Sequence, residues 1–248
     1  MEFSVLNESS LHNTLKVFYA TKTNGQMEVN AEGHIYDVVG EDGHIYEIQT
    51  KNLGKLCSKI QDTLEKGYKV TLVHPLVITT KIVTEDKDSN IISSRKSPKK
   101  GHILDLFNEL RGIYPVLLHE NFQLEVFEVN IIEHRLRTAE KIQSKNKMRR
   151  MKKDWIKTNK RLDEILKQHT FNSKEDYFNL LPDNLPEIFC AKDLAALYNV
   201  QNKELARGEK IPSRIIYNTN LIIWILNKME LLEFIEVKNR SRYYSLKK

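Results

Sequence analysis

The stretch that decides the fold is HIYDVVGEDGHIYEIQTKN, residues 34–52. Two short runs rich in β-branched and aromatic residues flank the Glu-Asp-Gly sequence at 41–43. An Asp-Gly turn between two such runs predicts an antiparallel hairpin. If the hairpin closes through this turn, Asp37 and Glu47 lie roughly level on adjacent strands.

Polar side chains interrupt both strands of this hairpin. Residues two apart share one face of a strand, so Glu47, Gln49 and Lys51 are expected on the same side. Two neighbouring carboxylates, Asp37 and Glu47, repel each other and are costly to bury unless a cation lies between them. Mg²⁺ accepts such oxygen ligands and can activate a water for attack on a phosphodiester. The alternative is that both carboxylates face solvent on a half-exposed sheet.

The surrounding sequence predicts a mixed α/β sandwich. Leu11, Leu15 and Phe18 have helical spacing, which predicts a helix over 8–20. The run YKVTLVHPL at 68–76 is the most apolar strand and is expected to lie centrally, ending near Pro75. The other expected elements are strands at 26–30, 77–84 and 122–130 and helices at 53–67 and 103–112.

The order of these elements resembles the core of the PD-(D/E)xK nuclease superfamily over roughly residues 7–78: a helix, a three-stranded meander that carries Asp37 and then Glu-x-Gln, a helix and a strand. The resemblance implies a mixed-sheet, restriction-endonuclease-like core. It also implies that Asp37 and Glu47 bind Mg²⁺ or Mn²⁺ and that catalysis depends on Asp37, Glu47, Gln49 and Lys51. Gln49 stands where the superfamily usually has Lys, and Lys51 is the candidate to replace that ammonium.

Two further resemblances concern single residues and short motifs. Glu8 matches a position where some superfamily members add another carboxylate, which makes it a further candidate metal ligand, and its alternative role is an ordinary acid in the first turn of a helix. The whole chain also resembles a bacterial family of unknown function that carries an EIQT motif and a downstream KSPK motif, here within RKSPKKG at 95–101.

Positive charge is clustered along the chain. The sequence of 248 residues has 39 Lys and Arg against 33 Asp and Glu, a net charge of +6. Residues 134–168 are dense in Lys and Arg and nearly free of Gly and Pro, which predicts a long basic helix or helix pair. Such a helix is either a phosphate-tracking surface or a solvated basic face. The candidate nucleic-acid contacts in this segment and in the SPKKG turn before it are Lys99, Lys100, Arg149, Arg150, Lys152 and Lys153.

The last region, 172–248, predicts helices followed by a β-hairpin with a basic tip, and a winged helix-turn-helix is the expected fold. A helix over 213–229 is the candidate recognition helix, with Arg214 and Asn218 placed to contact bases. Arg240 and Arg242 on the hairpin are placed to contact the DNA backbone. Winged helices also serve as protein–protein modules, and that alternative stays open.

Composition limits the remaining classes. No apolar run reaches roughly 18 residues, so no membrane partner is expected. The start of the chain lacks the pattern of a signal peptide, and Cys57 and Cys190 lack metal-type spacing, so a reduced, cytoplasmic protein is expected. The expected divisions are a nuclease-like domain at 1–132, a basic helical connector at 133–171 and a winged-helix domain at 172–248.

These features predict a metal-dependent DNA endonuclease or junction-cleaving enzyme. The main alternative is a catalytically weak or inactive nuclease scaffold that binds DNA or regulates, and Gln49 in the usual Lys position favours it. A third alternative is a partner-binding module whose basic charge only provides solubility. Assembly as a homodimer is left open.

Overall fold

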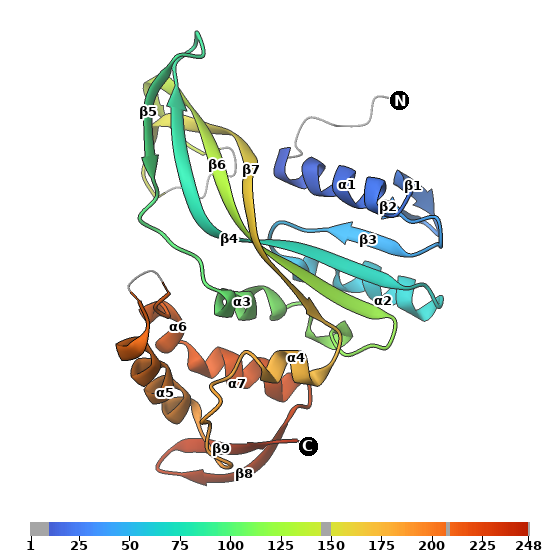
Figure 1. The fold of residues 1–248 in the computed structure, drawn as a ribbon, viewed down its shortest axis with the longest axis vertical. Coiled ribbons are helices and arrows are strands. Elements are labelled where there is room, and N and C mark those ends of the chain that lie inside the picture. The colour runs from blue at the N-terminus through green and yellow to red at the C-terminus, as the bar shows by residue number, and fades with distance from the viewer. Residues whose placement is uncertain (1–9, 145–149, 207–208, 248) are drawn as a thin grey trace.

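The computed structural model describes residues 10–144, 150–206 and 209–247. Seven strands form one mixed sheet in the order β1-β2-β3-β4-β6-β7, with β5 paired to β4, and helices pack on it (Figure 1). This confirms the expected α/β class. The strands of this sheet are β1 (Gln26–Ala31), β2 (His34–Val39), β3 (Ile45–Ile48), β4 (Val70–Glu85), β5 (Ile91–Lys96), β6 (Phe122–Ile142) and β7 (Lys153–Phe171).

The first half of the sheet follows the expected order. β1, β2 and β3 form an antiparallel meander, and β4 lies between β3 and β6 with both neighbours parallel to it. The central position of β4 is therefore confirmed, but its expected end at Pro75 is wrong. The Gln49 N–H donates to the Val73 carbonyl, so residues 73 and 75 point their backbone groups toward β3. Because β3 has ended by this point, the missing N–H of Pro75 removes no ladder bond.

Helices cover both faces of the meander (Figure 1). α1 (Ser10–Lys22) packs Leu11, Leu15 and Tyr19 against one face of the sheet. α2 (Cys57–Glu65), which follows the short 3-10 turn η2 (Leu53–Leu56), packs Ile60 and Leu64 against the other. Successive side chains of β4 point to opposite faces of the sheet, so Leu72 packs in the core on the α2 side and Val73 in the core on the α1 side.

The expected basic helix over 134–168 is wrong, because residues 134–142 lie in β6 and residues 153–168 lie in β7. The two strands pair antiparallel from Leu124–Phe171 out to Ile142–Lys153 and project beyond the helices with β4 and β5 (Figure 1). β6 also runs across the expected boundary at residue 132. A segment without Gly or Pro suits a long strand as well as a helix, and pairing with β4 on one side and β7 on the other decides between them.

The last region begins directly after β7. Its helices precede the hairpin of β8 and β9, as the sequence indicates, but the expected helix over 213–229 is divided at Tyr217 and Asn218. Its elements are α4 (Lys174–Phe178), α5 (Ala191–Glu204), α6 (Ser213–Ile216), α7 (Thr219–Lys228), β8 (Leu232–Lys238) and β9 (Ser241–Leu246).

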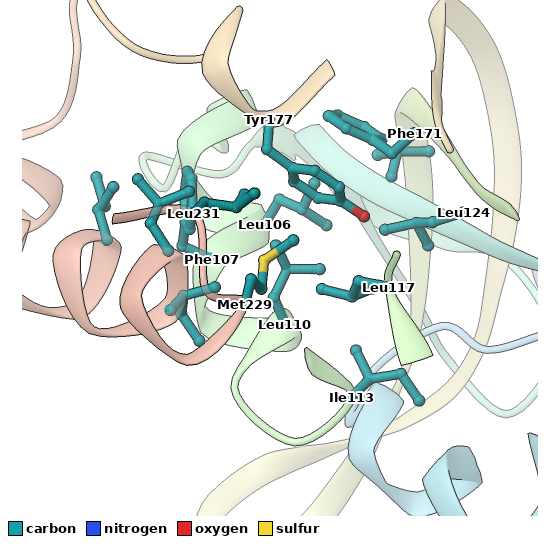
Figure 2. Close-up of a cluster of buried hydrophobic side chains, with 14 of the residues drawn as sticks. Leu106, Phe107, Leu110, Ile113, Leu117, Leu124, Phe171, Tyr177, Met229 and Leu231 are labelled. Carbon is teal, nitrogen blue, oxygen red and sulfur yellow. The ribbon is translucent and has the colours of Figure 1, made fainter. Parts of the chain in front are cut away.

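One continuous core joins this region to the sheet. It packs around η3 (Ile103–Asp105), α3 (Leu106–Leu110) and η4 (Tyr114–Val116), which follow β5. Figure 2 shows Leu110 of α3 and Met229 after α7 beside Leu117, with Tyr177 and Phe171 above Leu124. Within the described ranges, none of the helices is long and apolar enough to span a membrane.

Leu110→Ala should destabilise the whole chain, since Leu110 is fully buried between the sheet layer and the C-terminal helices. We expect a loss of about 2 to 5 kcal/mol of unfolding free energy in urea, typical of a large-to-small core change. Circular dichroism and Trp fluorescence should report one shared transition. Two separate transitions, with only one of them shifted, would contradict a continuous core.

Candidate active site

Asp37 and Glu47 lie at an opening between β2 and β3. Val38 pairs with Tyr46, and this register places Asp37 opposite Glu47, but the backbone ladder stops there. Side chains replace the missing backbone bonds: the Asp37 N–H donates to Glu47 Oε1 over 3.3 Å, and the Ile48 N–H donates to Asp37 Oδ2 over 2.9 Å. The two carboxylates therefore keep the strands apart and occupy the opening themselves.

The neighbouring strand is irregular at the same level. β1 pairs with β2 at Met27–Val38 and Val29–Tyr36 but not at Glu28–Asp37, and Glu28 has a φ of 55°. A left-handed φ at a residue that is not Gly is uncommon and marks local strain. Asp37 thus sits where the pairing is interrupted on both sides, which frees its carboxylate from the regular pleat.

Two side chains from α1 reach Asp37. Lys16 Nζ lies 3.4 Å from Asp37 Oδ1 and 3.0 Å from Glu28 Oε1. His12 Nε2 lies 3.5 Å from Asp37 Oδ2 and donates to the Ile48 carbonyl over 2.7 Å. Burial is the largest influence on the pKa of Asp37 and raises it. The hydrogen bonds from His12 and Ile48 and the charges of His12 and Lys16 outweigh it, so this pKa lies below its ordinary value.

A third cation, from α2, holds Glu47. Lys59 Nζ donates to Glu47 Oε1 over 2.5 Å and also to the Ile35 carbonyl, and it lies 4.9 Å from the centre of the Tyr36 ring. Glu47 is only 3% exposed. Burial raises its pKa above the ordinary value, the nearby Asp37 raises it further, and Lys59 offsets part of this rise.

The strand expected to carry Glu47, Gln49 and Lys51 is shorter than the sequence indicates. β3 ends at Ile48 and Lys51 lies in the bend beyond it, so the expected strand position of Lys51 is wrong, whereas the shared face of Glu47 and Gln49 stays a prediction. The Gln49 backbone continues the ladder toward β4 and its carbonyl contacts His74 Nδ1, while Lys51 is exposed in the bend that follows. Glu8 lies outside the described residues.

The ammonium groups at the site come instead from helices, which the hairpin sequence could not indicate. One signal was present: His12 and Lys16 are four residues apart and therefore share a helix face beside the Leu11–Leu15 stripe. His12 contacts Asp37 from within the fold, with its side chain largely buried. Nothing comparable in the sequence marks Lys59.

Asp37 and Glu47 offer carboxylate oxygens to a divalent cation. Among the residues that the structure describes, no group of three His, Cys, Asp or Glu side chains could enclose a metal ion. Mg²⁺, however, is commonly held by one or two carboxylates together with waters and substrate phosphates. Asp37 and Glu47, level on adjoining strands, fit that open arrangement. A bound ion would take over part of the charge neutralisation that Lys16 and Lys59 now provide.

The candidate nucleic-acid contacts in the last region differ in whether their side chains already bind other residues of the protein. Arg214 is exposed but already engaged within the protein, because its guanidinium binds Asp105 and donates to the Lys100 carbonyl over 2.8 Å. Asn218 is exposed at the start of α7, and Arg240 and Arg242 line a groove of about 730 Å³ between α7 and the hairpin.

The remaining candidates lie on the sheet and its connections. The exposed residues among them are Lys99 and Lys100 after β5 and Arg150, Lys152 and Lys153 at the start of β7. Arg149 lies outside the described residues.

Comparison with known proteins places this architecture in a family. Residues 9–172, which span the sheet from α1 to β7, match the family described as Domain of unknown function (DUF8091). An uncharacterized protein of Treponema pallidum (strain Nichols) is 31% identical over 195 residues, which cover 79% of this chain and 74% of that protein. No solved structure matches the chain. The chain therefore belongs to the family described as Domain of unknown function (DUF8091), and the candidate site lies within the matched region.

Proposed function

We propose that the protein is a metal-dependent nuclease that hydrolyses phosphodiester bonds in DNA, with Asp37 and Glu47 as the ligands of Mg²⁺ or Mn²⁺. One observation carries the proposal: the two carboxylates meet at an opened strand pair, and both are reached by cationic side chains from the covering helices. When bound, such an ion activates a water and stabilises charge on the phosphate.

The cations of the chain itself would act on the substrate. Lys16 reaches the pair from α1 and Lys59 from α2, so an ammonium on each face of the sheet is placed to neutralise a phosphate oxygen at the carboxylates. This offsets the absence of Lys at the position of Gln49. His12, held by the Ile48 carbonyl, keeps the end of β3 in place beside Asp37.

DNA is the proposed substrate because basic groups are exposed well beyond the site. Arg240 and Arg242 beside α7 suit the wing of a winged helix-turn-helix, the fold that we propose for 172–248. The exposed lysines at the start of β7 extend the positive surface along the sheet. We place the protein in the cytoplasm, where Cys57 and Cys190, both free thiols, would stay reduced.

A second candidate function is DNA binding without cleavage. The ion pairs at the site favour it, since Lys59 already neutralises Glu47 and Lys16 lies against Asp37. A protein that never binds a metal would be stable with such pairs.

A cleavage and binding assay separates the two functions. Purified protein is incubated with linear, branched and single-stranded DNA, with Mg²⁺, with Mn²⁺ and with EDTA. The nuclease proposal expects cleavage of at least one substrate that depends on the metal. Metal-independent binding that weakens steeply with salt, without cleavage of any substrate, would support the second candidate and exclude the first.

A further inference from the structure

A second site lies along the edge of β4. β3 pairs with β4 only as far as Val73, and β5 pairs with it from Lys81, so the stretch between has an open edge. The RKSPKKG segment fills it: the Ser97 N–H donates to the Thr80 carbonyl and the Gly101 N–H to the Ile78 carbonyl, both over 2.8 Å. These bonds satisfy an edge that would otherwise be unpaired.

Gly101 is required for this docking. A Cβ at this position would lie 2.0 Å from the Val77 carbonyl oxygen, a distance that the backbone cannot accommodate. The segment is thus seated closely on β4. As a result, Thr50 of the EIQT motif and Ser97 and Lys99 of the KSPK motif line one cleft.

The cleft has a volume of about 620 Å³ and its charged lining is mostly basic. We call it the Lys160 cleft; its basic side chains are Lys99, Arg135, Lys157, Lys160 and Arg214.

The carboxylates of the cleft are already engaged. Glu133 accepts from Arg135 Nε over 2.7 Å and binds Lys157 Nζ at 2.5 Å, and Asp105 is bound by Arg214. Glu109 accepts the backbone N–H groups of Asn52 and Leu53. No carboxylate of the cleft therefore remains for its other lysines.

Lys160 is a cationic residue of the cleft whose ammonium group has no acidic partner among the described residues. Its ammonium forms no hydrogen bond or ion pair with any residue that the structure describes, although its side chain is half-buried. Burial lowers the pKa of Lys160, and the charges of Lys157 and Lys51 lower it further against the opposing effect of Glu133. The ammonium groups of Lys51, Lys157 and Lys160 thus act on one another, and Glu133, the acidic group that acts on Lys160, is already bound by Arg135 and Lys157, which is unfavourable for Lys160 in the free protein.

We infer that the Lys160 cleft binds a phosphate group, with Lys160 as the main cation and Lys51, Lys157 and Lys99 around it. Thr50 and Ser97 add hydroxyl groups to the lining of the cleft. Phosphate binding in the cleft does not depend on the proposed function. The identification of that phosphate as part of a nucleic acid does rest on it. Thr50 lies two residues after Ile48, which contacts Asp37, so the two residues are separated by at most about 7 Å along the chain. A nucleic-acid strand with one phosphate in the cleft would therefore run toward the carboxylate pair, whereas free phosphate would fill the cleft alone.

Thermal unfolding with inorganic phosphate tests the cleft without DNA. At matched ionic strength, phosphate in place of chloride should raise the Tm of the wild type by about 2 to 4 °C, since a ligand of the folded state stabilises it. Lys160→Met should lose this response and Lys160→Arg should keep it. Lys203→Met, which removes an exposed lysine from the end of α5, is the matched control and should respond like the wild type.

Two further readings separate binding from a structural role. In chloride, Lys160→Met should have a Tm equal to or above that of the wild type, because it removes a half-buried cation without a partner. With duplex DNA, the same variant should reduce the slope of log K against log salt by about 0.9, the contribution of one phosphate contact.

The outcomes are distinct. If phosphate stabilises the wild type but not Lys160→Met while DNA does not bind, the cleft holds free phosphate, and the proposed function fails while this inference stands. If phosphate stabilises Lys160→Met as much as the wild type, or stabilises neither, the inference is overturned, whatever DNA does. A Tm of Lys160→Met well below that of Lys203→Met in chloride would also overturn it.

Discussion

Glu47→Gln should reduce metal-dependent DNA cleavage by at least about 100-fold. Removing a group that only supports a metal ligand already costs about 10- to 100-fold, and Glu47 is proposed as a ligand itself. Gln keeps an oxygen that can accept the Asp37 N–H, so the opened strand pair should persist. The measurement is the single-turnover rate on the best DNA substrate in Mg²⁺ and in Mn²⁺.

DNA binding should survive this substitution. Removing a negative charge near the phosphates weakens repulsion, so the Kd of Glu47→Gln in EDTA should equal that of the wild type or fall below it. Glu65→Gln, an exposed carboxylate at the end of α2, is the control and should leave the rate unchanged. Cleavage by Glu47→Gln at the wild-type rate would remove Glu47 from the mechanism.

Lys59→Met should destabilise the protein in a pH-dependent way. Glu47 would then lose the cation that pairs with it in a buried setting, and breaking such a pair by removing one partner costs about 3 to 5 kcal/mol. We expect a loss of about 3 kcal/mol at pH 8 from urea unfolding, and a smaller loss at pH 5.

The direction of the pH effect follows from Glu47. Its pKa in the folded protein already lies above the ordinary 4.5, and removing Lys59, which lowers it, raises it further. A carboxyl with a raised folded pKa stabilises the fold below its unfolded pKa, and this contribution is lost as pH rises through the folded pKa. Asp37, whose pKa is lowered, contributes stability that is lost as pH falls. Because the wild type and Lys59→Met both contain Asp37, this contribution does not change the sign of the difference between them.

A double variant checks the cause. Adding Glu47→Gln to Lys59→Met removes the unpaired charge, so most of the lost stability at pH 8 should return. A penalty for Lys59→Met that is equal at pH 5 and pH 8, and unchanged in the double variant, would show that Lys59 acts through packing on Tyr36 and not through its charge.

The hairpin at the centre of the site is readable from sequence because a short turn fixes its register. Once the turn at 41–43 closes, Asp37 and Glu47 can only lie level. The residues that complete the site come from other elements. Lys16 and Lys59 reach it only because α1 and α2 pack on opposite faces of the meander, a tertiary arrangement that local patterns do not contain.

The basic segment shows a different limit. Residues 134–142 and 153–168 carry few strand signals of their own, and their charge pattern suits a helix equally well. They become strands because the first part of β6 is a core strand beside β4, and the ladder continues outward from Ile131. Pairing with strands far apart in the sequence thus determines that these residues form strands, where their local propensity allows either a strand or a helix.

The charge cluster of the Lys160 cleft was only partly visible in the sequence. The KSPK motif suggested a phosphate contact at Lys99 and Lys100, and the structure seats Lys99 at the cleft. Lys160, 61 positions further along the chain, reaches the same cleft only through the pairing of β7 with β6.

Mn²⁺ binding in the absence of DNA, measured by electron paramagnetic resonance of free Mn²⁺ during titration, tests most directly whether Asp37 and Glu47 form a metal site. We expect one site per chain in the wild type that is lost in both Asp37→Asn and Glu47→Gln, while Glu65→Gln retains it. Lys59→Met should bind Mn²⁺ more tightly, because a competing ammonium is gone. A wild type without a Mn²⁺ site, or a site that both variants retain, would contradict the claim that Asp37 and Glu47 converge on one metal ion.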